Sequence, residues 1–258
     1  MSERKVTPPP PYSEADAAAG VEYSATTKGY SIPQTVSVFW PKQLDRVFYV
    51  GETWDELLFT VKMGYEKPSR TPLEVRLSSK PKGSVIARVD ELSDGVIVIP
   101  PPMGSPAEHN GTRVVLQKYT EWNKPRHMFS MVVGPRPWRK TETFEWRRSS
   151  GGKVRQLDGC TTGWKLVRVH NEVSPIRDDP ARRAQQQEDL TSDNKEVVAV
   201  FSVNESWFPS GKALMFRLHG SGATGELGGD FALVALLSAF KVWNPEESML
   251  NYIVKHIP

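Results

Sequence analysis

The stretch DFALVALLSAF, residues 230–240, decides the fold of this chain. Its ten residues 231–240 carry a single polar side chain, Ser238. Asp230 can cap the start of a helix, and Pro245 stops the helix from continuing. A helix that is apolar on every side must be buried on every side. We therefore predict a helix at the centre of the protein core. Its large apolar members are Phe231, Leu233, Val234, Leu236, Leu237 and Phe240.

Upstream of this helix, short apolar runs alternate with turn residues. The twelve runs are residues 36–40, 46–50, 57–63, 73–77, 85–89, 96–99, 113–116, 129–133, 142–147, 164–169, 196–202 and 213–219. In 143–147 every second residue is apolar, and 164–169 begins with the same alternation, which is typical of a strand with one buried face. Twelve strands and one fully buried helix fit a large antiparallel barrel that encloses the helix. The predicted fold is all-β (β-rich α+β).

The domain organisation follows from shifts in composition. Residues 1–30 are polar and proline-rich, so we predict a disordered arm there. Residues 31–258 form the predicted barrel domain. Within it, residues 171–195 are polar and without strand pattern, which predicts a flexible insertion. Residues 149–153, between two strands, read as a hairpin turn.

Composition places the chain among globular proteins. Of its 258 residues 38% are hydrophobic, and the net charge is +3, too balanced to indicate nucleic-acid binding. The single cysteine, Cys160, fits a reducing compartment. The N-terminus lacks the apolar segment of a signal peptide, and the longest apolar stretch is about half of what a bilayer span requires. We expect a cytoplasmic, peripheral-membrane or nuclear protein that is not secreted, of unknown oligomeric state.

The order of several segments resembles a known superfamily. These segments are residues 144–147, 163–168, 196–201, the glycine-rich 220–228 and the apolar helix. Together they are similar to the fungal branch of the tubby C-terminal-like superfamily, which also includes plant LURP-one-related proteins and phospholipid scramblases. The resemblance covers roughly residues 35–245 and implies a twelve-stranded barrel around a C-terminal hydrophobic helix. Tubby proteins bind phosphoinositide head groups, but their site does not match residue by residue here.

A proline-rich motif lies on the N-terminal arm. Pro9, Pro10, Pro11 and Tyr12 fit the Pro-Pro-x-Tyr pattern that WW domains bind. Prolines favour the polyproline II conformation, and an aromatic-lined groove accepts the ridges and the tyrosine. The motif indicates a WW-domain partner, of the ubiquitin-ligase type. A proline-rich tail without any partner is the alternative.

The glycine pattern of residues 220–225 matches G-x-G-x-x-G, a dinucleotide-binding signature. A Rossmann unit also needs a parallel sheet built of alternating strands and helices, and this sequence predicts an antiparallel one. We interpret the glycines as a tight turn that leads the chain into the barrel against the helix. No cofactor is expected.

A basic cluster follows the middle of the chain. Its members are Arg136, Arg139, Lys140, Arg147, Arg148, Lys153 and Arg155. With Trp138 and Trp146 interleaved, the cluster is a candidate contact for anionic phospholipid surfaces. Solvated faces of strands produce the same pattern and are the more common explanation.

The sequence contains no recognisable catalytic or metal site. Its five histidines have no ligand spacing, and no serine-hydrolase, zinc-protease or P-loop motif occurs. Cys160 lies in a polar loop, where a lone thiol is more often neither nucleophile nor lipidation site.

Two functions from different classes stay open at this point. The first is a non-enzymatic binding or adaptor module that contacts anionic lipid and recruits a WW-domain protein. The second is an accessory or cyclase-like protein acting on a hydrophobic small molecule in fungal specialised metabolism. An apolar cavity with convergent polar groups at one end of the barrel would favour the second.

Overall fold

The fold is known from a computed structural model. It describes residues 25–27, 30–40, 47–62, 73–77, 83–90, 95–100, 111–122, 124–135, 137, 139–157, 162–169, 190–204 and 211–243. The sheet strands are β3 (Thr35–Phe39), β4 (Val47–Gly51), β5 (Leu57–Lys62), β6 (Leu73–Leu77), β7 (Ser84–Asp90), β8 (Val96–Ile99), β9 (Thr112–Val115), β10 (Gln117–Glu121), β11 (Lys124–Val133), β12 (Lys140–Ser149), β13 (Gly163–Arg168), β14 (Val197–Val203) and β15 (Lys212–Leu218). All neighbouring pairs are antiparallel, in the order β10-β11-β12-β13-β14-β15-β3-β4-β5-β6-β7-β8-β9.

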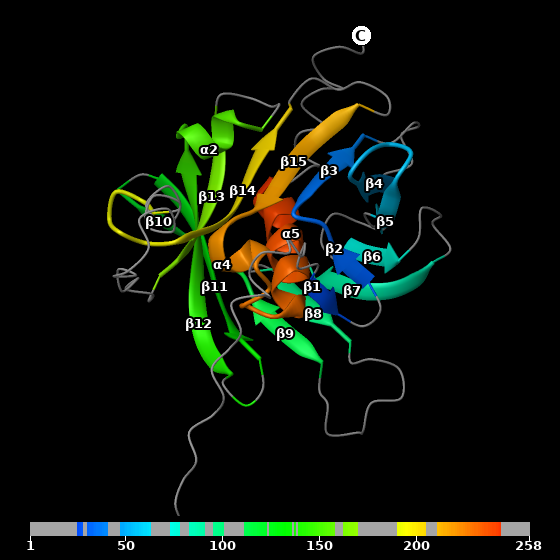
Figure 1. The fold of residues 1–258 in the computed structure, drawn as a ribbon, viewed down its shortest axis with the longest axis horizontal. Helices are drawn as coiled ribbons and strands as arrows, with labels where there is room; N and C mark the ends of the chain where they lie inside the picture. The colour runs from blue at the N-terminus through cyan, green and yellow to red at the C-terminus, as the bar shows by residue number, and fades with distance from the viewer. Residues whose placement is uncertain are drawn as a thin grey trace, which may run out of the picture.

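This sheet curls into a nearly closed barrel around one helix. The strand β9 at one end of the order lies against β11 near the other end. The helix α5 (Gly229–Trp243) runs inside the barrel (Figure 1). Residues 231–240 are all buried, including the six large apolar side chains predicted to form the core. The predicted all-β barrel with an enclosed C-terminal helix is confirmed.

Aromatic side chains join the helix to the wall along its length. Near its start, the rings of Phe231 and Phe144 are 4.9 Å apart. Near its end, Trp243 packs against Trp40 at 5.5 Å and Phe48 at 5.6 Å. Each buried aromatic of this size stabilises the fold by about 1.5–3 kcal/mol relative to an exposed one.

The strands match the predicted apolar runs with one addition. Each of the twelve runs falls on a strand, whereas β10 was not predicted. Its sequence QKYTE has no apolar alternation, and all five residues are exposed. Outside the barrel sheet, β1 (Ala25–Thr27) pairs with β2 (Tyr30–Ile32), so the predicted arm ends in a short ladder.

The predicted hairpin turn at residues 149–153 is wrong in detail. The chain turns there, and β12 and β13 are antiparallel neighbours, but the connection contains the short helix α2 (Gly152–Arg155). Val154 and Leu157 pack against Val197, Val200 and Met215, forming a second apolar cluster outside the main core. The connection forms a helix rather than a tight turn because Val154 and Leu157 bury themselves against apolar side chains of the sheet.

The glycine-rich segment forms a turn, as predicted. It contains the short helix α4 (Gly220–Ala223), and Gly220, Gly225 and Gly228 have φ values of +47°, +78° and +84°. A Cβ atom on Gly222 would lie 2.3 Å from the carbonyl oxygen of Val198. These positions need glycine for backbone shape and close approach to β14, which accounts for the pattern without a nucleotide.

The helix α5 starts at Gly229, two residues earlier than predicted. Asp230 lies in its first turn rather than ahead of it, and its carboxylate accepts a hydrogen bond from Thr112. A carboxylate in the first turn still interacts favourably with the helix dipole. Among the described residues, no helix is long and apolar enough to cross a bilayer.

Several predicted features lie outside the described residues. These are the motif of residues 9–12, Cys160, and most of the insertion at 171–195. From that insertion the structure describes residues 190–195, where Leu190 forms an isolated bridge with Glu196.

Candidate functional site

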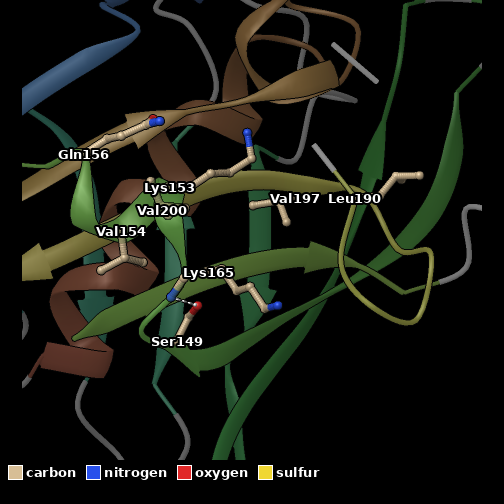
Figure 2. Close-up of a pocket in the computed structure, with 10 residues that line it drawn as sticks. Ser149, Lys153, Val154, Gln156, Lys165, Leu190, Val197 and Val200 are labelled. Atoms are coloured by element: carbon tan, nitrogen blue, oxygen red, sulfur yellow. Dashed lines mark hydrogen bonds between the residues drawn. The ribbon is translucent and has the colours of Figure 1, made fainter. Parts of the chain in front are cut away.

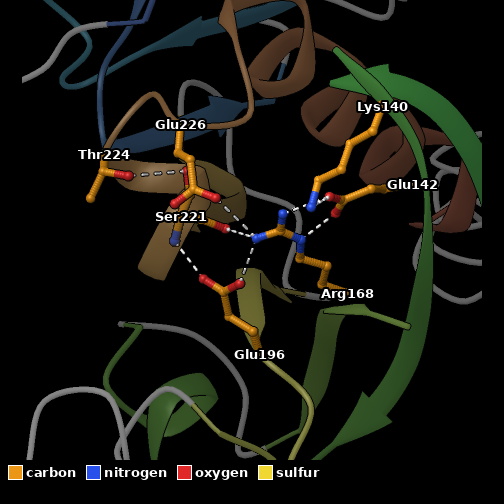
Figure 3. Close-up of polar contacts among 7 residues, drawn as sticks. All are labelled: Lys140, Glu142, Arg168, Glu196, Ser221, Thr224 and Glu226. Carbon is orange, nitrogen blue, oxygen red and sulfur yellow. Dashed lines mark hydrogen bonds and ion pairs between the residues drawn. The ribbon is translucent and has the colours of Figure 1, made fainter. Parts of the chain in front are cut away.

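A buried ion-pair network closes the end of the barrel where α5 begins. Its centre is Arg168, the last residue of β13, with 3% of its surface exposed. The guanidinium binds Glu142 of β12 through Nε and through Nη2, the latter at 2.6 Å. Its Nη1 donates to Glu196 at 3.1 Å, to Ser221 at 3.2 Å and to Glu226 at 3.3 Å (Figure 3).

Further contacts satisfy the carboxylates of this network. The Nζ of Lys140 lies 2.6 Å from Glu142, and the amide of Ser221 donates to Glu196 at 2.6 Å. Burial alone would raise the pKa of Glu142, but hydrogen bonds from Arg168 and Lys140 lower it below its ordinary value. The network joins β12 and β13 to the glycine-rich turn. Because each nitrogen of the Arg168 guanidinium already donates to a described side chain, we interpret the network as structural rather than as a ligand site.

A second polar network lies on the outer face of β12 and joins it to β10 and to residue 193. Glu145 of β12 accepts a hydrogen bond from the Tyr119 hydroxyl at 2.5 Å and pairs with Arg147 at 2.5 Å. Arg147 also binds Asp193 at 2.8 Å. Burial and the Glu145 contact raise the pKa of Tyr119 to about 12. Despite partial burial, the contacts with Thr191 and Arg147 lower the pKa of Asp193 to about 2.

Next to this network lies a pocket of about 320 Å³. It is bounded by the segment around α2 on one side and by β13 and β14 on the other (Figure 2). Val154, Val197, Val200 and Leu190 supply its apolar surface. The glycines at 151 and 152 expose backbone at the rim, where the amide of Gly151 donates to Ser149 Oγ at 3.2 Å.

Two lysines line this pocket, Lys153 from α2 and Lys165 from β13. They lie on opposite sides of Val197 in the view of Figure 2. Lys153 Nζ is 3.5 Å from Nδ1 of His219. Burial and the neighbouring Arg147 lower the pKa of Lys165. The nearby carboxylate of Asp193 opposes this lowering. Two ammonium groups beside an apolar wall are the side chains that would contact a ligand with an apolar part and a negative charge.

The predicted basic cluster is dispersed over the surface. Lys140 and Arg147 are held in the two carboxylate networks, and Lys153 lines the pocket. Arg148 and Arg155 are exposed near α2, whereas Arg136 lies outside the described residues. Arg139 is exposed at a second pocket, of about 380 Å³, which Arg113, Asp230 and the start of α5 also line. The structure thus brings Lys153, Arg148 and Arg155 to one region and separates Arg139 from it.

The described residues include no group of three or more side chains able to hold a metal ion. Of the two histidines in this part of the chain, His127 stacks edge-on against Trp164, with ring centres 5.6 Å apart. Burial, with Lys118 and Lys241 nearby, lowers the pKa of His127 to about 4. This histidine is therefore neutral at pH 7.

The comparisons with known proteins identify no relative. No family model, no curated protein and no solved structure matches this chain. The near-closed barrel with its enclosed helix is shown by the structure itself, and the superfamily resemblance stays a prediction.

Sequence reasoning missed Arg168 and Lys165. The alternation of side chains along a strand could have identified Arg168, because it lies on the same face as Trp164 and Leu166, which point inward. Lys165 alternates outward like an ordinary solvated residue. Its place in a pocket depends on α2 and on residues 190–195, whose positions no local pattern predicts.

Proposed function

We propose that this protein is a non-enzymatic binding module for an anionic amphiphile, with the head group of an anionic phospholipid as the intended ligand. The observation that carries the proposal is the 320 Å³ pocket with a valine-rich surface and two lysines on its walls. Phosphate oxygens accept hydrogen bonds from ammonium groups, and the hydrocarbon adjoining the phosphate would contact Val197 and Val200.

The place of the helix supports binding rather than catalysis. The side chains of α5 occupy the barrel interior, with Phe231, Leu237 and Phe240 no more than 1% exposed. The least exposed charged side chain among the described residues, Arg168, is already bound by carboxylates. A cyclase-like site needs a hydrophobic cavity into which unpaired polar groups point, and no such observation favours it among the described residues.

The tubby-like resemblance is consistent with this proposal. A twelve-stranded barrel around a C-terminal helix was expected from it, and the present barrel has the same enclosed helix with one more strand. Membership in that superfamily is part of the proposal, resting on the order of the motifs and the barrel architecture.

Lys165→Gln tests the pocket, with Lys62→Gln as the matched control on an exposed position of β5. We expect phosphatidylcholine vesicles containing phosphatidylserine or a phosphoinositide to bind the wild type in a salt-sensitive manner. Lys165→Gln should weaken binding about tenfold, the value of one charge-assisted contact, and Lys62→Gln should not.

Separate arms of the same titration distinguish the sources of the negative charge. Inositol trisphosphate and inorganic phosphate would report head-group binding without a bilayer. Equal binding by wild type and Lys165→Gln in every arm would exclude the pocket as the binding site. The absence of any binding by the wild type would exclude the proposed function.

The second part of the proposal concerns the N-terminal arm, outside the described residues. Pro9, Pro10, Pro11 and Tyr12 would recruit a WW-domain protein of the ubiquitin-ligase type to the site where the barrel binds. A pulldown with a WW domain should retain the wild type and lose Tyr12→Ala, while Tyr23→Ala, outside the motif, should remain bound. Retention of Tyr12→Ala would refute this part alone.

A further inference from the structure

Trp122 is the most exposed large hydrophobic residue in the described part of the chain. Its exposed fraction is 89%, compared with 56% for Val132, the next highest. The residue forms the turn between β10 and β11, and its φ of 50° lies in the left-handed region. Most side chains occupy this region at a cost in free energy, and glycine or asparagine is the usual choice.

Nothing in the described fold offsets that cost. The indole makes no ring contact or hydrogen bond with the described residues, and almost none of its surface is buried. Burial of apolar surface is the main way in which a tryptophan stabilises a protein. A fully exposed tryptophan in a strained turn therefore suggests a binding partner that covers it.

The hairpin that carries Trp122 separates from the barrel wall. Strand β11 starts at Lys124 but pairs with β12 only from Arg126 onward, where its partner is Arg147. β12 itself continues to Ser149. All five residues of β10 are exposed, and this strand lies at the left edge of the barrel in Figure 1. The end of the hairpin that carries Trp122 is therefore paired only within the hairpin and not with β12.

The charges beside the tip favour an anionic surface. Lys118 and Lys124 are exposed on the two strands of the hairpin, and neither forms an ion pair with a described residue. The acidic Glu121 is bound by Arg126 at 3.1 Å. A tryptophan near two exposed lysines that form no ion pair with the described residues has the composition of an interfacial membrane anchor.

The hairpin tip and the lysine pocket occupy the same end of the barrel. Arg126 pairs with Arg147, and the two strands are antiparallel. The chain from Arg126 back to Trp122 and the chain from Arg147 forward to Ser149 therefore run toward the same end of the barrel, and Ser149 lines the pocket. Arg148 and Arg155 are exposed at this level as well. One flat bilayer could therefore meet the indole, these arginines and the pocket rim together.

We propose that the β10–β11 hairpin is a membrane anchor, in which Trp122 inserts into the interface of an anionic bilayer while the pocket binds a lipid head group. This inference rests on the proposed function and adds a second contact that depends on the bilayer. Binding then has two components, a salt-sensitive one from the lysines and arginines and a salt-resistant one from the indole.

The experiment compares full-length wild type, Trp122→Gly and Val132→Ala on phosphatidylcholine vesicles with phosphatidylserine. Val132 is the matched control because it is an exposed apolar residue at the far end of the same strand β11. We expect Trp122→Gly to weaken vesicle binding by at least about tenfold and to retain or raise the melting temperature, since glycine relieves the strained turn. Val132→Ala should bind like the wild type.

A second readout locates the indole. Lipids brominated on their acyl chains should quench part of the tryptophan emission of the bound wild type, and Trp122→Gly should lose most of that quenching. Binding of inositol trisphosphate should be equal in the two proteins.

Wild-type vesicle binding by Trp122→Gly, or bromolipid quenching equal to that of the wild type, would overturn the anchor. In that case the proposed function would still stand if Lys165→Gln weakened vesicle binding as expected. If the wild type fails to bind vesicles and inositol trisphosphate alike, both proposals fall together.

Discussion

The indole Nε1 of Trp146 donates a hydrogen bond of 2.8 Å to Oγ of Ser238, and both residues are fully buried. Trp146 belongs to the barrel wall, and Ser238 is the one polar side chain among the ten residues 231–240 of the enclosed helix. The serine hydroxyl in turn donates to the carbonyl of Ala235 at 2.8 Å. This contact adds a directional link between helix and wall to the aromatic packing, because the hydrophobic effect by itself is non-directional.

Ser238→Ala should therefore destabilise the protein, although alanine is the better helix former. The buried indole N–H would lose its acceptor, at a cost of about 1–3 kcal/mol. Urea unfolding measures the change. The exposed pair of Ser130 and Thr143, whose hydroxyls are 2.8 Å apart, supplies a control, since Ser130→Ala should change stability by at most about 0.5 kcal/mol. Equal effects of the two substitutions would contradict the role given to Ser238.

Arg168→Met should be among the most destabilising single substitutions in this chain. It leaves the buried carboxylate of Glu142 without its main partner, which typically costs about 3–5 kcal/mol. Because Glu142→Gln removes the orphaned charge, the double variant should be more stable than Arg168→Met alone. Arg148→Met, at an exposed arginine of β12, should cost at most about 0.5 kcal/mol. Additive effects of Arg168→Met and Glu142→Gln would show that the two are not coupled.

Gly222→Ala and Gly152→Ala should have opposite effects. At Gly222 the new Cβ would meet the carbonyl oxygen of Val198 at 2.3 Å, so the turn before α5 must shift. At Gly152 no atom lies within 4 Å, and alanine favours the helical conformation by up to about 1 kcal/mol. Thermal unfolding of both variants checks this expectation. A stable Gly222→Ala protein would mean that the turn does not approach β14 as closely as described.

The environment of His127 predicts a specific dependence of stability on pH. Its folded pKa of about 4 lies below the ordinary value of 6.5, so the unfolded state binds the proton more readily. Its contribution to the free energy of unfolding is fully present above about pH 6.5, where the side chain is neutral in both states. That contribution is lost as the pH falls from there toward 4. His127→Gln should lack this component of the pH dependence. Urea unfolding of both proteins at pH 7 and pH 4.5 measures it, and parallel losses would refute the assignment.

Much of the fold could be predicted because burial leaves a periodic record in strands and helices. Residues 231–240 are apolar on all sides and lie in the centre of the barrel. The apolar runs 143–147 and 164–169 do form strands, β12 and β13, but both strands are buried on both faces in places: Phe144, Glu145 and Trp146 are all buried, as are Leu166, Val167 and Arg168. The strand β10 escaped prediction because it is exposed on both faces and is held by backbone pairing with β11.

The candidate site was harder to predict because its residues come from segments far apart in sequence. Lys153 and Lys165 share a pocket only because α2 folds back over β13 and β14. Arg147 appeared to be a surface cation, yet Glu145 and Asp193 neutralise it. Trp122 gave no signal, since a tryptophan in a turn indicates neither burial nor exposure until the geometry of the hairpin is known.

The central claim is that ligand binds on the outside of a barrel whose interior is filled by its own helix. Methyl NMR of the full-length protein, titrated with the soluble short-chain lipid dihexanoyl phosphatidylserine, tests it most directly. We predict that the methyl signals of Val154, Val197 and Val200 shift with added lipid, while those of Leu233 and Leu237 in α5 remain in place. Shifts centred on Leu233 and Leu237, with the pocket valines unchanged, would show a ligand inside the barrel and contradict the account.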